Sequence, residues 1–195
     1  MEIAIIKYNA GNTQSVLYAL QRLGYKAIVT NDTNELRNAD KIIFPGVGNA
    51  AAAMQSLQQS KLDELIPTLK QPVLGVCVGM QLLCNYSEEN NTKCLGIVDT
   101  TVKKFDSAEF KIPQMGWNNI YDYNSVLLDG LKENEFVYYV HSYYAEICSA
   151  TVAKTDYILP YSAILQQDNF YGVQFHTEKS AQAGDKILSN FLELT

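Results

Sequence analysis

The sequence predicts an α/β fold in which an open, mostly parallel sheet is flanked by helices and extended by antiparallel strands. Short apolar runs alternate with helical periods through the first hundred residues. These runs continue without polar alternation, as is typical of parallel strands buried on both faces. From Leu95 to about Phe170, strand-like runs follow one another instead. Strand–helix alternation implies right-handed crossovers and ligands at the carboxyl ends of the strands.

The first four strands are expected at residues 2–7, 26–30, 41–44 and 72–76, with helices at 16–23, 50–57, 62–69 and 80–84. Gly24 stands where a helix C-cap belongs. Later strands are expected at residues 96–102, 135–144, 150–157, 162–167 and 171–175. These strands are predicted to extend the same sheet. A closing helix places Ile187, Leu188, Phe191 and Leu192 on one apolar stripe.

Length and composition indicate one folded domain over residues 1–195, because 47% of the residues are hydrophobic and 18% are charged. The 15 basic and 21 acidic residues give a net charge of −6, which argues against nucleic acid and anionic membranes as partners. The N-terminal residues do not resemble a signal peptide, and no apolar run is long enough to span a bilayer. We therefore expect a cytoplasmic protein.

The four cysteines are expected to be reduced thiols in that compartment. They form no C-x-x-C pair, and the two histidines do not stand at zinc-ligand spacing from them. The sequence predicts no metal site.

Residues 75–79, Gly-Val-Cys-Val-Gly, follow an apolar strand and precede a helix. This is the context in which a G-x-nucleophile-x-G elbow forms. Cys77 would lie at a helix N-terminus, where the dipole favours a thiolate. A buried cysteine between packing glycines is the structural alternative.

His176 follows the last expected strand, and Glu178 stands two residues further on, so that in extended chain both side chains project from one face. A carboxylate so placed orients an imidazole, as in nucleophile–base–acid sets. The alternative is that Glu178 caps the last helix. His176 and Cys77 are both expected at carboxyl ends of parallel strands, on the same rim of the sheet.

Residues 44–48, Phe-Pro-Gly-Val-Gly, end the third strand on that rim. Backbone N–H groups there, together with that of Val78, are candidate donors to an oxyanion. An ordinary strand–helix turn is the alternative.

Together these motifs resemble class I glutamine amidotransferases, whose flavodoxin-like domain releases ammonia from glutamine with a Cys-His-Glu triad. Residues 45–48, 112–118, 139–143 and 178–180 resemble, within that family, the glutaminase subunits of imidazole glycerol phosphate synthase in histidine biosynthesis. The resemblance covers nearly the whole chain.

The resemblance implies roles for individual residues. The implied catalytic residues are Cys77, His176 and Glu178; the oxyanion donors lie at Val78, Val47 and Gly48; glutamine is held by Gly48, Gln81, Ser142 and Tyr143; and the partner contacts are Asn12, Trp117, Tyr138 and Lys179. No cofactor is implied. The implied partner is a (β/α)8-barrel cyclase, which would receive the ammonia in a heterodimer and switch on a glutaminase whose oxyanion strand is misaligned at rest.

Two positions depart from the family pattern: Thr177 stands where proline is usual, and Gln114 where histidine is usual. Thr177 loosens the backbone between His176 and Glu178. Three rival functions remain open at this point: a glutaminase subunit of another synthase, such as anthranilate synthase or a surface-sugar amidating enzyme; a cysteine peptidase or chaperone-like relative; and a non-catalytic binding module on the same fold.

Overall fold

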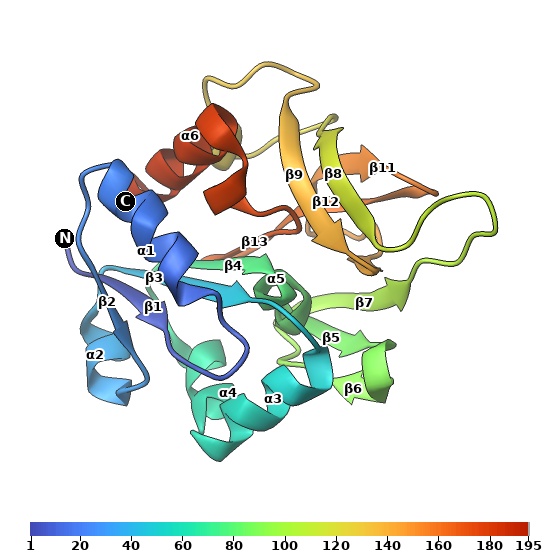
Figure 1. Ribbon diagram of the computed structural model, residues 1–195. Coiled ribbons are helices and arrows are strands. Elements are labelled where there is room, and N and C mark those ends of the chain that lie inside the picture. The colour runs from blue at the N-terminus through green and yellow to red at the C-terminus, as the bar shows by residue number, and fades with distance from the viewer. Residues whose placement is uncertain (195) are drawn as a thin grey trace.

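The computed structural model describes residues 1–194 and is built around a seven-stranded sheet (Figure 1). Five neighbouring strands are parallel: β2 (Ala27–Thr30), β1 (Ile3–Ile6), β3 (Lys41–Gly46), β4 (Val73–Cys77) and β13 (Phe170–Val173). Two antiparallel strands, β12 (Pro160–Gln167) and β11 (Thr151–Asp156), extend the sheet beyond β13. The predicted α/β fold with an antiparallel extension is confirmed.

Helices cover both faces of this sheet. The helices are α1 (Thr13–Arg22), α2 (Thr33–Asn38), α3 (Ala50–Gln59), α4 (Leu62–Leu65), α5 (Val78–Leu83) and α6 (Ala181–Leu192). Figure 1 shows α1 and α6 on one face, with α2, α3 and α4 on the other. None of the helices in residues 1–194 is long and apolar enough to cross a membrane.

Side-chain caps fix where several helices begin. Asn12 Oδ1 accepts from Ser15 N at the start of α1, and Asn49 Oδ1 accepts from two backbone N–H groups at the start of α3. Asn is among the preferred N-cap residues because its side chain satisfies otherwise unpaired backbone donors. Gly24, with φ +85°, follows α1 as the sequence predicts.

The expectation that all later strands join the central sheet is only partly correct. A separate four-stranded sheet contains β5 (Cys84–Ser87), β6 (Thr92–Lys93), β7 (Val98–Lys104) and β10 (Tyr143–Ala145). A two-stranded ladder joins β8 (Gln114–Asn119) to β9 (Phe136–His141). The run predicted as one strand over 135–144 divides at Ser142, because β9 pairs with β8 whereas β10 pairs with β7. Cys84, expected in a helix, begins β5.

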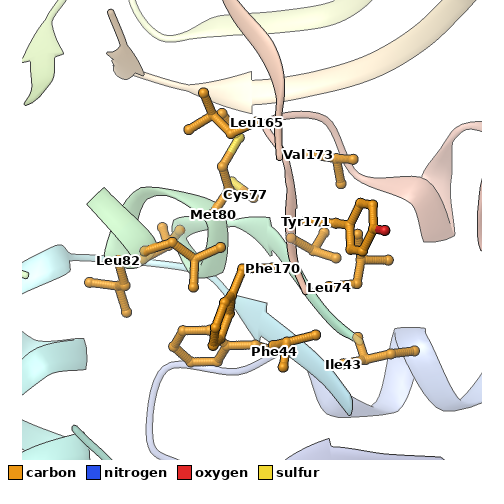
Figure 2. Close-up of a cluster of buried hydrophobic side chains, with 14 of the residues drawn as sticks. Ile43, Phe44, Leu74, Cys77, Met80, Leu82, Leu165, Phe170, Tyr171 and Val173 are labelled. Atoms are coloured by element: carbon orange, nitrogen blue, oxygen red, sulfur yellow. The ribbon is translucent and has the colours of Figure 1, made fainter. Parts of the chain in front are cut away.

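The core around the central strands ends at Cys77. Figure 2 shows buried side chains of β3, β4, β13 and α5 on both faces of the sheet, Phe44, Leu74, Met80 and Tyr171 among them. Cys77 belongs to this buried cluster and is 3% exposed. Apolar packing therefore fixes the position of the candidate nucleophile.

Candidate active site

Cys77 stands at the junction of β4 and α5 in a strained backbone conformation. Its φ of 55° and ψ of −111° fall outside the regions that L-residues normally occupy. Such strain persists only where the surroundings enforce it, and it is concentrated at functional sites. The sharp strand-to-helix turn predicted from the glycine spacing is thus present.

Glycines allow two backbone segments to touch directly beside Cys77. A Cβ on Gly79 would lie 2.0 Å from the carbonyl oxygen of Phe44, and a Cβ on Gly46 would lie 2.3 Å from the nitrogen of Gly79. Both distances are far shorter than any real Cβ contact, so both positions require glycine. The end of β3 therefore packs against the first turn of α5.

His176 reaches Cys77 because their strands are neighbours. In the parallel pair β13 and β4, Gly172 is opposite Gly75, so the chain leaves both strands at the same rim. His176 Nδ1 lies 2.8 Å from Glu178 Oε1, and these side chains are 5% and 2% exposed. Such a short, buried contact fixes the orientation of the imidazole ring.

The environment of His176 favours its charged form. Burial lowers the pKa of His176, but hydrogen bonds to Cys77 and Glu178 and their negative charges outweigh burial and raise the pKa to about 10. The ring is therefore held in its protonated form between Cys77 and Glu178.

A cavity of about 340 Å³ opens over Cys77. It is lined by Val47, Gly48, Cys77, Val78, Gln81, Glu89, Pro113, Val140, His141, Ser142, Tyr143, His176 and Lys179. The candidate catalytic and glutamine-binding residues predicted from the sequence line this cavity, except Glu178, which lies behind His176. A small polar substrate fits a hollow of this size and lining.

The amide of Gln81 is held in a fixed orientation in the wall of this cavity. Its Nε2 donates to the Tyr143 carbonyl at 2.9 Å and to Gln174 Oε1 at 3.0 Å. Gln174 Nε2 in turn lies 3.9 Å from Cys77 Sγ. Because both protons of the Gln81 amide are used, its oxygen is the atom left for a ligand.

Val47 differs from the sequence-based expectation. Its N–H donates to the Ala10 carbonyl at 2.6 Å, so it is not available to an oxyanion in this conformation. The Tyr8 hydroxyl holds the same segment by donating to the Pro45 carbonyl at 2.7 Å. Val78, in contrast, begins α5, where first-turn N–H groups have no partner inside the helix.

Sequence reasoning missed two residues of the site, Glu89 and Gln174. Glu89 lines the cavity and accepts the Ala50 N–H at 2.7 Å through Oε2. Its neighbours are acidic and amide residues, a composition typical of a solvated turn, so local sequence gives no signal for a site residue. Gln174 precedes His176 by two positions, just after β13, so the same two-residue spacing that relates His176 to Glu178 could have identified it.

The four residues predicted to contact a partner lie in three different parts of the structure. Trp117 is 53% exposed on β8, and its ring meets Tyr138 of β9 edge to face at 5.8 Å between centroids. Lys179 is exposed at the cavity mouth. Asn12 caps α1 with its side chain. In the described part of the chain, no three His, Cys, Asp or Glu side chains are grouped as metal ligands.

Comparison with known proteins gives the family. The family model of class I glutamine amidotransferases matches residues 4–194. The imidazole glycerol phosphate synthase subunit HisH of Bacteroides fragilis is 56% identical over 196 residues, covering 100% of both chains. The protein of the same name from Bacteroides thetaiotaomicron is 54% identical, also over 100% of both.

A solved structure of a glutamine amidotransferase agrees in fold. Its TM-score is 0.76 at 15% identity, over 98% of this chain and 97% of that chain. The motifs, the geometry at Cys77 and these relatives lead to one assignment. The chain belongs to the class I glutamine amidotransferase family.

Proposed function

We propose that this chain is the glutaminase subunit of an imidazole glycerol phosphate synthase and hydrolyses glutamine to glutamate and ammonia. The observation that supports it most directly is the buried His176–Glu178 contact beside the strained Cys77 elbow. Cys77 is the proposed nucleophile, His176 the acid and base, and Glu178 the group that orients the ring. The 56% identity to a subunit of that name supports the assignment to this synthase.

In the proposed mechanism, Cys77 Sγ attacks the side-chain amide carbon of glutamine, and the C=O electrons move onto oxygen. The oxyanion is received by the Val78 N–H and an N–H of the 47–48 segment. His176 protonates the departing nitrogen, which leaves as ammonia and yields a thioester. His176 then takes a proton from water, which attacks the thioester and releases glutamate.

The cavity lining supports a set of contacts to glutamine. The carboxylate of Glu89 and the free oxygen of Gln81 suit the α-ammonium group. The backbone at Gly48, Ser142 and Tyr143 is proposed to hold the rest of the substrate.

A partner is proposed to complete the oxyanion site. The Val47–Ala10 hydrogen bond must break before the Val47 N–H can turn toward the substrate, so the isolated chain is expected to be slow. The proposed partner is a (β/α)8-barrel cyclase that receives the ammonia in a heterodimer and docks near Asn12, Trp117, Tyr138 and Lys179. The proposal includes a cytoplasmic location, supported by four unpaired cysteines.

The test replaces Cys77 with alanine in the complex with the cyclase. We expect Cys77→Ala to abolish glutamine-dependent synthesis and to leave synthesis from added ammonium salt unchanged. Cys148→Ala, at a half-buried thiol outside the cavity lining, is the matched control and should keep both activities. Loss of both activities in Cys77→Ala would show that the cysteine supports the fold or the interface instead.

A further inference from the structure

A buried row of polar groups runs beneath the cavity wall, from the start of β8 to the Tyr143 carbonyl. Gln114 Oε1 lies 2.7 Å from Tyr161 Oη, which lies 3.0 Å from His141 Nε2. His141 Nδ1 lies 2.7 Å from the carbonyl oxygen of Tyr143. Gln114, Tyr161 and His141 are 3%, 0% and 7% exposed, so water does not compete for these contacts.

The direction of the hydrogen bonds follows from the chemistry of the groups. A carbonyl oxygen only accepts, so His141 Nδ1 bears a proton and donates to Tyr143. Burial, aided by the nearby charge of His176, lowers the pKa of His141 to about 4, which keeps the ring neutral at neutral pH. Nε2 is then an acceptor, and the donor that reaches it is the single proton of Tyr161.

We propose that Tyr161 and His141 are positioning residues for glutamine. Tyr161 donates to His141 Nε2 and fixes the ring in the tautomer that holds the Tyr143 carbonyl, and this holds the Ser142–Tyr143 backbone in the cavity wall. The Gln114 amide then turns its NH2 group toward the Tyr161 hydroxyl. This inference rests on the proposed function, because it assigns Ser142 and Tyr143 to substrate binding.

The carbonyls of Ser142 and Tyr143 are held in different ways. Ser142 interrupts the run between β9 and β10, and its carbonyl accepts only a loop hydrogen bond, from Phe105 N at 3.0 Å. The Tyr143 carbonyl accepts from two side chains instead, Gln81 and His141. Removing the His141 contact leaves Gln81 as the one side chain that donates to the Tyr143 carbonyl.

A neighbouring tyrosine provides a matched control. Tyr139 is also 0% exposed and packs 6.3 Å from the Tyr161 ring, but its hydroxyl faces Thr155 and makes no hydrogen bond to any member of the row. Tyr161→Phe and Tyr139→Phe each remove one buried hydroxyl from the same aromatic cluster. Only the first breaks the row that leads to Tyr143.

The experiment measures inactivation of the purified chain by a diazo-ketone analogue of glutamine and by iodoacetamide. For Tyr161→Phe we expect the half-saturating concentration of the glutamine analogue to rise roughly 3- to 10-fold, the effect of one neutral hydrogen bond. The iodoacetamide rate should not change, because this reagent needs Cys77 and not the substrate-holding wall. In the complex, KM for glutamine should rise by the same factor, with synthesis from ammonium salt unchanged.

A second variant tests whether Tyr161 acts through His141. In His141→Asn, the side-chain NH2 still reaches toward Tyr143 but no longer meets Tyr161, so adding Tyr161→Phe should raise KM no further. An equal rise of KM in both backgrounds, or a rise of the same size in Tyr139→Phe, would overturn the inference. Failure of the wild-type complex to hydrolyse glutamine would refute the proposed function itself.

Discussion

His141 and His176 are both buried in the site, yet their surroundings shift their pKa values in opposite directions. Burial lowers the pKa of each ring, because it penalises the charged form. His141 faces an uncharged carbonyl and an uncharged phenol, so the effect of burial is the largest and the pKa falls. His176 faces Cys77 and Glu178, and their hydrogen bonds and negative charges prevail instead.

These shifts predict an unusual titration. In the NMR spectrum of histidine-labelled protein, we expect neither ring to titrate near pH 6.5; His141 should titrate at about 4 and His176 at about 10. The chain contains only two histidines, so His141→Asn assigns both signals. Glu178→Gln should move the His176 titration to lower pH. Titration of His176 at its ordinary pKa in the wild type would contradict the assigned charge pair.

The same shift links His176 to stability. Its pKa is raised on folding, so its contribution to the free energy of unfolding is fully present below about pH 6.5 and is lost as the pH rises toward 10. Urea unfolding should therefore show the difference between wild type and Glu178→Gln shrinking as the pH rises over this range. A difference that grows with pH would contradict the sign.

At the level of elements, the short 3₁₀ turn Thr177–Lys179 connects the end of β13 to α6. Thr177 opens this turn, and its buried hydroxyl has no partner in the described residues. His176 before it has φ −90° and ψ 103°, which is the extended conformation that a residue preceding proline prefers. Threonine at this position therefore leaves a buried polar group unpaired.

Thr177→Pro is predicted to stabilise the chain by about 0.5–1 kcal/mol, because proline suits the first position of such a turn and reduces the freedom of the unfolded chain. Thermal or urea unfolding measures this change. Thr177→Val, which removes the hydroxyl without fixing φ, separates the two contributions. A destabilised Thr177→Pro protein would mean that the Thr177 N–H makes a contact that the fold needs.

Some elements were predictable from local sequence, and others were not. β1, β4 and β3 after Lys41 are uninterrupted apolar runs, which predict buried parallel strands. β8 was missed because Gln114–Asn119 contains a glycine and three amide side chains, and its strand conformation depends on pairing with β9. Local pattern cannot show which sheet a strand joins.

The site residues likewise divide into those that local sequence predicts and those that depend on tertiary packing. The proximity of Cys77 to His176 was predictable, because parallel strands end on a common rim. The place of Glu89 in the cavity lining was not predictable, because it depends on how the 3₁₀ turn Glu89–Asn91 packs against α3. The engagement of the Val47 N–H with Ala10 is likewise a tertiary contact that no local pattern encodes.

On the scale of the whole molecule, exposed apolar side chains gather on the β8–β9 ladder and the loop before it. Phe110, Met115, Trp117 and Phe136 are 47%, 63%, 53% and 54% exposed. At one end of the ladder, Gln114 pairs with His141, and both are buried. His141 lines the active-site cavity. A partner docked on this ladder would lie close to the proposed active site.

Trp117→Ala should therefore weaken association with the cyclase by about 2 kcal/mol or more, roughly a 30-fold increase in Kd. Titration of the partner, with glutamate and cyclised product measured together, tests this. Ile28→Ala, at a 47% exposed apolar residue on the far edge strand β2, is the control and should leave Kd unchanged. Normal affinity with one glutamate per product in Trp117→Ala would place the tryptophan outside the interface.

The contact between Gly46 and Gly79 also constrains how this protein can evolve. Any side chain on either residue would collide with the backbone of the other segment, and no neighbouring side chain can be trimmed to make room. Substitution of either glycine alone would therefore force the end of β3 away from the first turn of α5. Each glycine is therefore required by the packing of the active-site backbone, whether or not it touches a substrate.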